Sequence, residues 1–275
     1  MVKMSMSINL AALTQDLLNH RGVGMTPPSE QSSTFSFKDA YRVATRLMQH
    51  RAQQGAKLVG RKVGISNKSA WEKMGLDNIV WGYMLDETVT LLPSNSTRLS
   101  LAGTSAPRIE PEIVFKLREP PPVDFDAVEL LRYVEWMGLG FEVVDCPYPD
   151  WKFKPVDLVA TYGFHTALVI GELLEPDPLQ LAELAQALSE THVKLYKNGE
   201  IVAEGSGKNV VDNPALSLAH LAQAVQEQPD TPPLQAKEII STGTLTTAVR
   251  IDPGDVVEAE VSGLGLPRLR LELTT

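Results

Sequence analysis

The chain has 275 residues, of which 43% are hydrophobic and 21% are charged. This composition is that of an ordinary globular protein and excludes collagen-like, disordered and membrane-spanning classes, because no segment approaches the roughly 18 unbroken apolar residues of a spanning helix. The net charge of -9 disfavours nucleic acids and anionic membranes as partners, since both bind cationic patches. The first residues lack a signal-peptide pattern and the lone Cys146 allows no internal disulfide, so we expect a cytoplasmic protein.

Residues 1–85 predict a small N-terminal α/β domain. Apolar residues recur at helical spacing in two segments, and turn signals separate these segments from a run that is typical of a strand. The elements expected in chain order are a helix with Ser7 as its N-cap, a helix with a capping box of Ser36 and Asp39 that ends at Gly55, a strand over 56–65, and a short helix or lid loop over 66–75.

Residues 86–275 predict a second domain that is rich in strands. Short β-branched runs predict strands over 112–115, 141–144, 167–170, 193–196, 238–241 and 256–261. Helices are predicted over 126–136, 178–188 and 214–225, the last with Asn213 as its cap and Pro214 as its first residue. This irregular order lacks the βαβ rhythm of a doubly wound sheet, so we expect an α+β fold with a curved or rolled sheet.

Three glutamates predict a metal site. Glu110 and Glu112 head an apolar run, and residues two apart on an extended chain point to the same face, about 6.6 Å apart. Glu142 lies within another apolar run, where a lone buried carboxylate is costly. Three carboxylates at one point need a cation, and all-oxygen ligation favours Mg²⁺, Mn²⁺ or Ca²⁺. The alternative is a solvated strand face, and Pro111 favours a strand edge or start.

Lys62 and two glycine-bearing segments are further candidates. Lys62 lies in a glycine-flanked run, where its ammonium either stabilises an oxyanion in a site or is an ordinary surface cation of a strand. The segments 205–207 and 243–244 either present donors to a substrate carboxylate or form turns. The sequence contains neither a P-loop nor a dinucleotide-binding motif. Of the histidines, His165 is the one that we expect near a site, with a structural role as the alternative.

Six motifs follow one another over nearly the whole chain. They are GRKVGIS at 60–66, WGYMLD at 81–86, RIEPEI at 108–113, FEVVD at 141–145, PDWKF at 149–153 and STGTLT at 241–246. In this order and spacing, the sequence resembles the hydratase/decarboxylase branch of the fumarylacetoacetate hydrolase superfamily. The resemblance implies a mixed β-sandwich roll.

The resemblance also implies the roles of individual residues. It implies a Mg²⁺ or Mn²⁺ ion held by three carboxylates, which map onto Glu110, Glu112 and Glu142. It implies an active-site lysine, which maps onto Lys62. For the bound substrate, a small 2-oxo dicarboxylate, we expect contacts from Arg61, Thr161, Tyr162 and Thr244.

One departure from the pattern bears on the reaction. Hydratases of this branch tend to carry an Asp-Asn-Ala-Ser type stretch where this chain has VATYGFH at 159–165. In this stretch the sequence is similar to the 4-oxalocrotonate decarboxylases. That similarity implies loss of CO₂ from 2-oxohex-3-enedioate in a meta-cleavage pathway for aromatic compounds. Hydration of 2-hydroxypenta-2,4-dienoate is the alternative. C–C bond hydrolysis and a catalytically silent subunit are more distant alternatives. The resemblance further implies a homo-oligomer and a complex with the hydratase of the same pathway.

Overall fold

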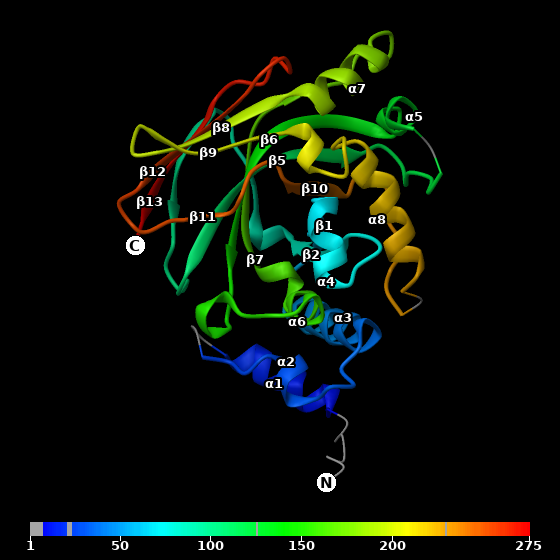
Figure 1. Ribbon diagram of the computed structural model, residues 1–275, viewed down its shortest axis with the longest axis vertical. Helices are drawn as coiled ribbons and strands as arrows, with labels where there is room; N and C mark the ends of the chain where they lie inside the picture. Colours follow the sequence, from blue (N-terminus) through cyan, green and yellow to red (C-terminus); the bar gives the residue numbers. More distant parts are fainter. Residues whose placement is uncertain (1–7, 21–23, 125, 229) are drawn as a thin grey trace.

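The computed structural model describes residues 8–20, 24–124, 126–228 and 230–275. Two mixed β-sheets make up the body of the molecule, and helices cover it at one end and along one side (Figure 1). In the described part of the chain, no helix combines the length and the apolar character needed to cross a lipid bilayer. The predicted α+β class with a rolled sheet is confirmed.

The larger sheet has eight strands and holds the long central strands of the fold. Its order is β2 (Val80–Leu85), β1 (Leu58–Gly64), β10 (Ile239–Thr244), β5 (Pro107–Leu117), β6 (Val134–Asp145), β7 (His165–Leu174) and β3 (Val89–Leu91), with β11 (Val249–Arg250) also paired to β5. The five-stranded sheet has the order β4 (Ser96–Ser100), β13 (Leu269–Thr274), β12 (Val256–Val261), β8 (His192–Lys197) and β9 (Glu200–Ser206).

The helices are short apart from one. They are α1 (Leu10–Asn19), α2 (Pro28–Gln31), α3 (Phe37–Gln53), α4 (Trp71–Met74), α5 (Ala127–Leu131), α6 (Pro155–Ala160), α7 (Leu181–Glu190) and α8 (Leu216–Gln226). Short 3-10 turns are η1 (Lys68–Ala70), η2 (Asp86–Thr88), η3 (Pro149–Trp151), η4 (Tyr162–Phe164) and η5 (Gly207–Asn209). Figure 1 shows α1, α2, α3 and α6 together at one end of the molecule.

Local capping chemistry explains where the helices begin. The Oγ of Ser36 accepts the backbone N–H of Asp39, and the Asp39 carboxylate accepts the backbone N–H of Ser36, so the predicted capping box of α3 is confirmed. Helix α1 is capped by Asn9, whose side chain accepts two backbone N–H groups. The predicted cap Ser7 lies outside the described residues.

Three predicted helices have wrong boundaries. The helix predicted over 178–188 is α7, which begins at Leu181 and ends at Glu190. The helix predicted over 126–136 ends at Leu131, and β6 begins at Val134, because the apolar run enters the central sheet and satisfies its backbone groups there. The last predicted helix begins at Leu216, since Asn213 instead accepts the backbone N–H of Ala215 in a preceding turn.

The predicted division at residue 85 does not separate two hydrogen-bonded units. Strands β1 and β2 come from the first 85 residues, yet β1 pairs in parallel with β10 near the end of the chain. Buried residues of α3 also belong to the same apolar core as those of β5 and β6. The first 85 residues therefore contribute two strands to the main sheet.

Candidate metal centre

Strand pairing brings the three predicted metal ligands together. Glu110 and Glu112 lie on the same face of β5, and the antiparallel register of β5 and β6 places Glu142 directly opposite Glu110. One carboxylate oxygen from each residue lies within 4.8 Å of the others. Glu112 and Glu142 are buried and Glu110 is half-buried, so the three glutamates do not form a solvated strand face.

Pro111 lies in a central strand, contrary to the expected strand edge or start. Its carbonyl oxygen accepts the backbone N–H of Leu245, so its nitrogen also faces the side of β10. The pairing of β10 with β5 shifts register opposite residues 112–114, and β10 ends at Thr244, opposite Glu112. A ladder hydrogen bond from residue 111 is therefore not needed, and proline fits between the two glutamates.

Glu112 is anchored through one oxygen only. Its Oε2 accepts the hydroxyl of Ser241 at 2.5 Å and the backbone N–H of Gly243 at 2.9 Å. Its Oε1 is buried and has no hydrogen-bond partner. Gly243 has a φ of 105°, and a Cβ there would lie 2.3 Å from the Oγ of Ser66, so glycine is required. Glu112 thus presents a free, desolvated carboxylate oxygen to the centre of the cluster.

Glu142 contacts two cationic or polar side chains. The Nζ of Lys62 lies 3.0 Å from its Oε2, and the Nδ1 of His165 lies 2.7 Å from its Oε1. Burial would raise the pKa of Glu142, but the charge of Lys62 and the contacts with His165 together hold that pKa below its usual range. Glu142 is therefore ionised in the folded protein.

The electrostatics of the cluster favour a divalent cation. Burial raises the pKa of Glu110 to about 7, and the pKa of Glu112 is raised by burial and by the charges of Glu142 and Glu110. Burial lowers the pKa of Lys62, but the three glutamates raise it by more. The net shift is upward, so the ammonium stays charged. With all carboxylates ionised, one lysine leaves two negative charges uncompensated. The hard oxygen donors and the unpartnered Oε1 of Glu112 suit Mg²⁺.

The pKa of Glu110 predicts that protons and metal compete. A carboxyl whose pKa rises from 4.5 to about 7 on folding binds protons more tightly in the folded than in the unfolded state, and proton binding therefore stabilises the fold at low pH. The metal-free protein loses this stabilisation as the pH rises from 4.5 to about 7. We expect Mg²⁺ to raise the melting temperature more at about pH 8 than at about pH 6. Thermal unfolding with Mg²⁺ or with chelator at both pH values measures this, and equal shifts would contradict it.

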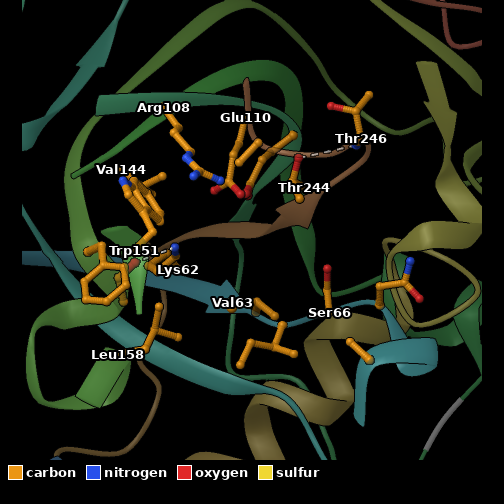
Figure 2. A pocket seen from close by; sticks show the side chains of 18 of the residues that line it. Lys62, Val63, Ser66, Arg108, Glu110, Val144, Trp151, Leu158, Thr244 and Thr246 are labelled. Atoms are coloured by element: carbon orange, nitrogen blue, oxygen red, sulfur yellow. Dashed lines mark hydrogen bonds between the residues drawn. The ribbon is translucent and has the colours of Figure 1, made fainter. Parts of the chain in front are cut away.

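A cavity of about 460 Å³ opens over Glu110 and Glu112. Figure 2 shows the side chains of Arg108 and Glu110 directed toward the space that Lys62 and Thr244 also face. The apolar part of the wall comes from Val144, Trp151, Phe153 and Leu158, among others. The cavity therefore joins a charged end to an apolar wall, as a site for a small organic anion requires.

Arg108 is a site residue that the sequence analysis missed. Its guanidinium carbon lies 4.1 Å from the ring centroid of Trp151, and the indole N–H of Trp151 donates to the Ala106 carbonyl at 3.1 Å. Within the described ranges, Arg108 makes no ion pair and its side chain makes no hydrogen bond. Its position two residues before Glu110 on a strand was the signal that could have found it.

Thr244 lines the cavity, but Arg61 does not. Side chains alternate along β1, so Lys62 points into the cavity and Arg61 points to the opposite face. There Arg61 is fully buried, donates to Glu238 at 2.5 Å, and lies 5.3 Å from the ring centroid of Trp81. The expectation that Arg61 contacts substrate is therefore corrected to a structural ion pair.

Thr161 and Tyr162 line a second cavity of about 440 Å³ and are also absent from the wall of the first. Tyr162 and Gly163 have φ values of 58° and 68°, which turn the backbone so that Gly163 faces Lys62. The Gly163 carbonyl accepts a hydrogen bond from the Lys62 ammonium at 3.1 Å, and a Cβ on Gly163 would lie 2.7 Å from the Lys62 side chain. In this segment Gly163 and Phe164 line the first cavity, and Thr161 and Tyr162 do not.

Comparisons with known proteins agree with this fold. Residues 59–272 match the family model described as fumarylacetoacetate (FAA) hydrolase, C-terminal. A 4-oxalocrotonate decarboxylase from a Pseudomonas species is 27% identical over 240 residues, which is 87% of this chain and 89% of that protein. A 2-hydroxyhexa-2,4-dienoate hydratase from Comamonas testosteroni is 28% identical over 245 residues, 88% of each chain.

A solved structure is similar over almost the full length. It is the 4-oxalocrotonate decarboxylase from Pseudomonas putida G7 complexed with magnesium and adipate, with a TM-score of 0.80, 25% identity, and coverage of 96% of this chain and 95% of that one. The relatives are thus named as enzymes of two kinds on one scaffold. The chain belongs to the fumarylacetoacetate hydrolase family.

Proposed function

We propose that this protein is a divalent-metal-dependent decarboxylase of a small unsaturated 2-oxo dicarboxylate, 2-oxohex-3-enedioate. The observation that carries the proposal is the cluster of Glu110, Glu112 and Glu142 beside Lys62 at the base of a cavity. The similar structure from Pseudomonas putida G7 is complexed with magnesium and adipate, and adipate is a dicarboxylate with the same six carbons as the proposed substrate.

The three glutamates would hold Mg²⁺, with Mn²⁺ as the second choice, because their donors are all hard oxygens. When bound, the ion supplies Lewis-acid polarisation of the 2-oxo group. Mg²⁺ and the Lys62 ammonium together cancel the charge of three ionised carboxylates. Arg108 then leaves the cavity with a positive charge for an anionic substrate.

The reaction needs no nucleophile from the protein. The bond between C5 and C6 breaks, its electron pair moves through C4 and C3 to the 2-oxygen, and C6 leaves as CO₂. One proton is then taken up at the 2-oxygen to give 2-hydroxypenta-2,4-dienoate. The buried Lys62 ammonium stabilises the charge that develops on this oxygen and can supply the proton, since its raised pKa keeps it protonated.

Arg108 is proposed to bind a carboxylate of the substrate. Its N–H groups have no protein acceptor among the described residues, and stacking on Trp151 holds the guanidinium at the cavity wall. We expect Arg108→Met to raise KM at least about tenfold, since a hydrogen bond to a charged group contributes about 1.5–3 kcal/mol. Steady-state kinetics measure this, with Arg98→Met as control, because Arg98 is exposed on β4 in the other sheet, where it pairs with Glu272. An unchanged KM would remove Arg108 from substrate binding.

Hydration of 2-hydroxypenta-2,4-dienoate is the second candidate function. Relatives named as hydratases match this chain about as well as those named as decarboxylases, and the same metal and lysine would serve both reactions. The purified protein with Mg²⁺ is to be incubated with each substrate, and CO₂ release compared with formation of 4-hydroxy-2-oxopentanoate. We expect CO₂ release from the dicarboxylate. Hydration without CO₂ release would overturn the assignment.

We further propose that this protein forms a complex with the hydratase of the same pathway. The decarboxylation product is an unstable dienol, and it is the substrate of the hydratase reaction. A complex of the two enzymes, each in oligomeric form, would pass this dienol on before it tautomerises. Size-exclusion chromatography of this protein with and without a cognate hydratase tests the complex, and separate elution at micromolar concentration would contradict it.

A further inference from the structure

The imidazole of His165 lies between Glu142 and Thr88. Its Nδ1 is 2.7 Å from Oε1 of Glu142, and its Nε2 is 2.9 Å from Oγ1 of Thr88. The Thr88 hydroxyl is in turn 2.9 Å from the carbonyl oxygen of Leu85. The His165 side chain is 2% exposed and that of Glu142 is fully buried, so solvent does not compete for these contacts. Both ends of the histidine are therefore held by the protein.

Strand pairing fixes the positions of His165, Glu142 and Thr88. Thr88 ends η2 and precedes β3, whose first residue, Val89, pairs with Leu168 of β7. His165 is the first residue of β7, and it pairs with Val144 of β6, two residues from Glu142. Because three adjacent strands set these positions, the ring has little freedom to move relative to Glu142.

Glu142 depends on its contact with His165 more than Glu112, the other buried ligand, depends on any single partner. Glu112 is fixed by Ser241 and by the backbone N–H of Gly243, and the proposed reaction assigns neither donor to the substrate. In the parts of the chain that the structure describes, the Glu142 carboxylate has two partners, Lys62 and His165. In the proposed reaction, Lys62 also interacts with the substrate oxygen. Its ammonium is therefore shared between Glu142 and the substrate.

We propose that His165, supported by Thr88, is a positioning residue that keeps Glu142 aimed at the metal while Lys62 serves the substrate. This inference rests on the proposed metal centre. Nothing in the sequence placed these residues together, since His165 is 23 positions from Glu142 and 77 from Thr88. A ligand held by one fixed donor keeps its direction, and loss of such a supporting contact weakens metal affinity by about 10- to 100-fold in other metal sites.

The test is Mg²⁺ and Mn²⁺ affinity, measured by isothermal titration calorimetry on the full-length protein. We expect His165→Leu to weaken affinity about tenfold or more, because it removes the donor to Oε1. His165→Asn should restore most of the affinity, because its amide nitrogen can occupy the place of Nδ1. Thr88→Val should have a smaller effect, because it removes the support of the ring and leaves the donor in place.

His220→Leu is the matched control. The Nδ1 of His220 also makes a 2.7 Å contact with a side-chain oxygen, that of Asn78, but His220 does not line the cavity. We expect the metal affinity of this variant to equal that of the wild type. If His165→Leu fails to fold by circular dichroism, His165→Asn and Thr88→Val carry the comparison.

The outcomes separate this inference from the proposed metal centre. If the wild type binds neither ion, the metal centre itself is wrong. If the wild type binds metal and the variants at positions 165 and 88 bind it within twofold of the wild type, only the positioning role is overturned. Loss of affinity in His165→Leu with recovery in His165→Asn supports the positioning role, because a merely structural defect would not be restored by one amide.

Discussion

Glu110→Gln is expected to abolish metal-dependent turnover while the fold remains intact. Glutamine keeps the shape of the side chain but removes a charged oxygen donor, and Mg²⁺ binds neutral amide oxygens less strongly than carboxylates. We expect CO₂ release to fall at least about a hundredfold, which corresponds to about 2.7 kcal/mol of transition-state stabilisation. Assays across a range of Mg²⁺ concentrations measure whether the loss is in metal binding or in turnover.

The same substitution should stabilise the metal-free protein. Burial and the charge of Glu142 raise the pKa of Glu110 to about 7, which means that ionised Glu110 destabilises the folded state in the absence of metal. Replacing it with a neutral side chain removes that cost at about pH 8. We therefore expect a higher melting temperature in chelator for Glu110→Gln than for the wild type, and a smaller increase on adding Mg²⁺.

Glu272→Gln is the control for this pair of measurements. Glu272 lies on β13 in the other sheet, where it pairs with Arg98 and Arg270 at the surface. Its replacement should leave turnover and the Mg²⁺ effect unchanged. Turnover that persists in Glu110→Gln, with the metal effect of the wild type, would contradict a role for Glu110 as a ligand.

Lys62→Met is expected to separate turnover from metal binding. The ammonium of Lys62 lies 3.0 Å from Glu142, is buried, and is the cation that would face the oxygen where charge develops. Removal of one such preorganised donor costs about 100- to 1,000-fold in turnover. Metal should still bind, because the three carboxylates remain and their mutual repulsion is then relieved by the ion alone.

Stability measurements on Lys62→Met provide an independent readout. Without the ammonium, the metal-free protein buries Glu142 with one fewer partner, so its melting temperature in chelator should fall. Mg²⁺ should recover more stability in this variant than in the wild type. Lys68→Met is the control, since Lys68 is exposed and pairs with Asp212. Turnover within tenfold of the wild type in Lys62→Met would exclude the proposed role.

Local rules predicted the parts of the site that depend on neighbouring residues. The two-residue alternation of a strand placed Glu110 and Glu112 on one face, and the structure bears this out. The capping box of Ser36 and Asp39 was also readable, because its two hydrogen bonds lie within one turn. The same alternation, applied to β1, already implied that Arg61 and Lys62 face opposite sides.

Contacts between distant segments were beyond such rules. The apolar residues over 126–136 are compatible with both a helix and a strand. Pairing within the central sheet makes the chain a strand from Val134. The turn at Tyr162 and Gly163 depends on positive φ values that no neighbouring motif signals. Consequently the glycine reaches Lys62, and the side chains expected there line another cavity.

By itself, the sequence determined the residue types of the centre: three carboxylates, one lysine, and a strand period that aligns two of the acids. Only the tertiary structure decided that Glu142 stands opposite Glu110, that His165 holds Glu142, and that Arg108 has no protein acceptor in the described chain. The physical reason is that strand register and burial are set by packing across the whole sheet. Spacing along one segment cannot specify them.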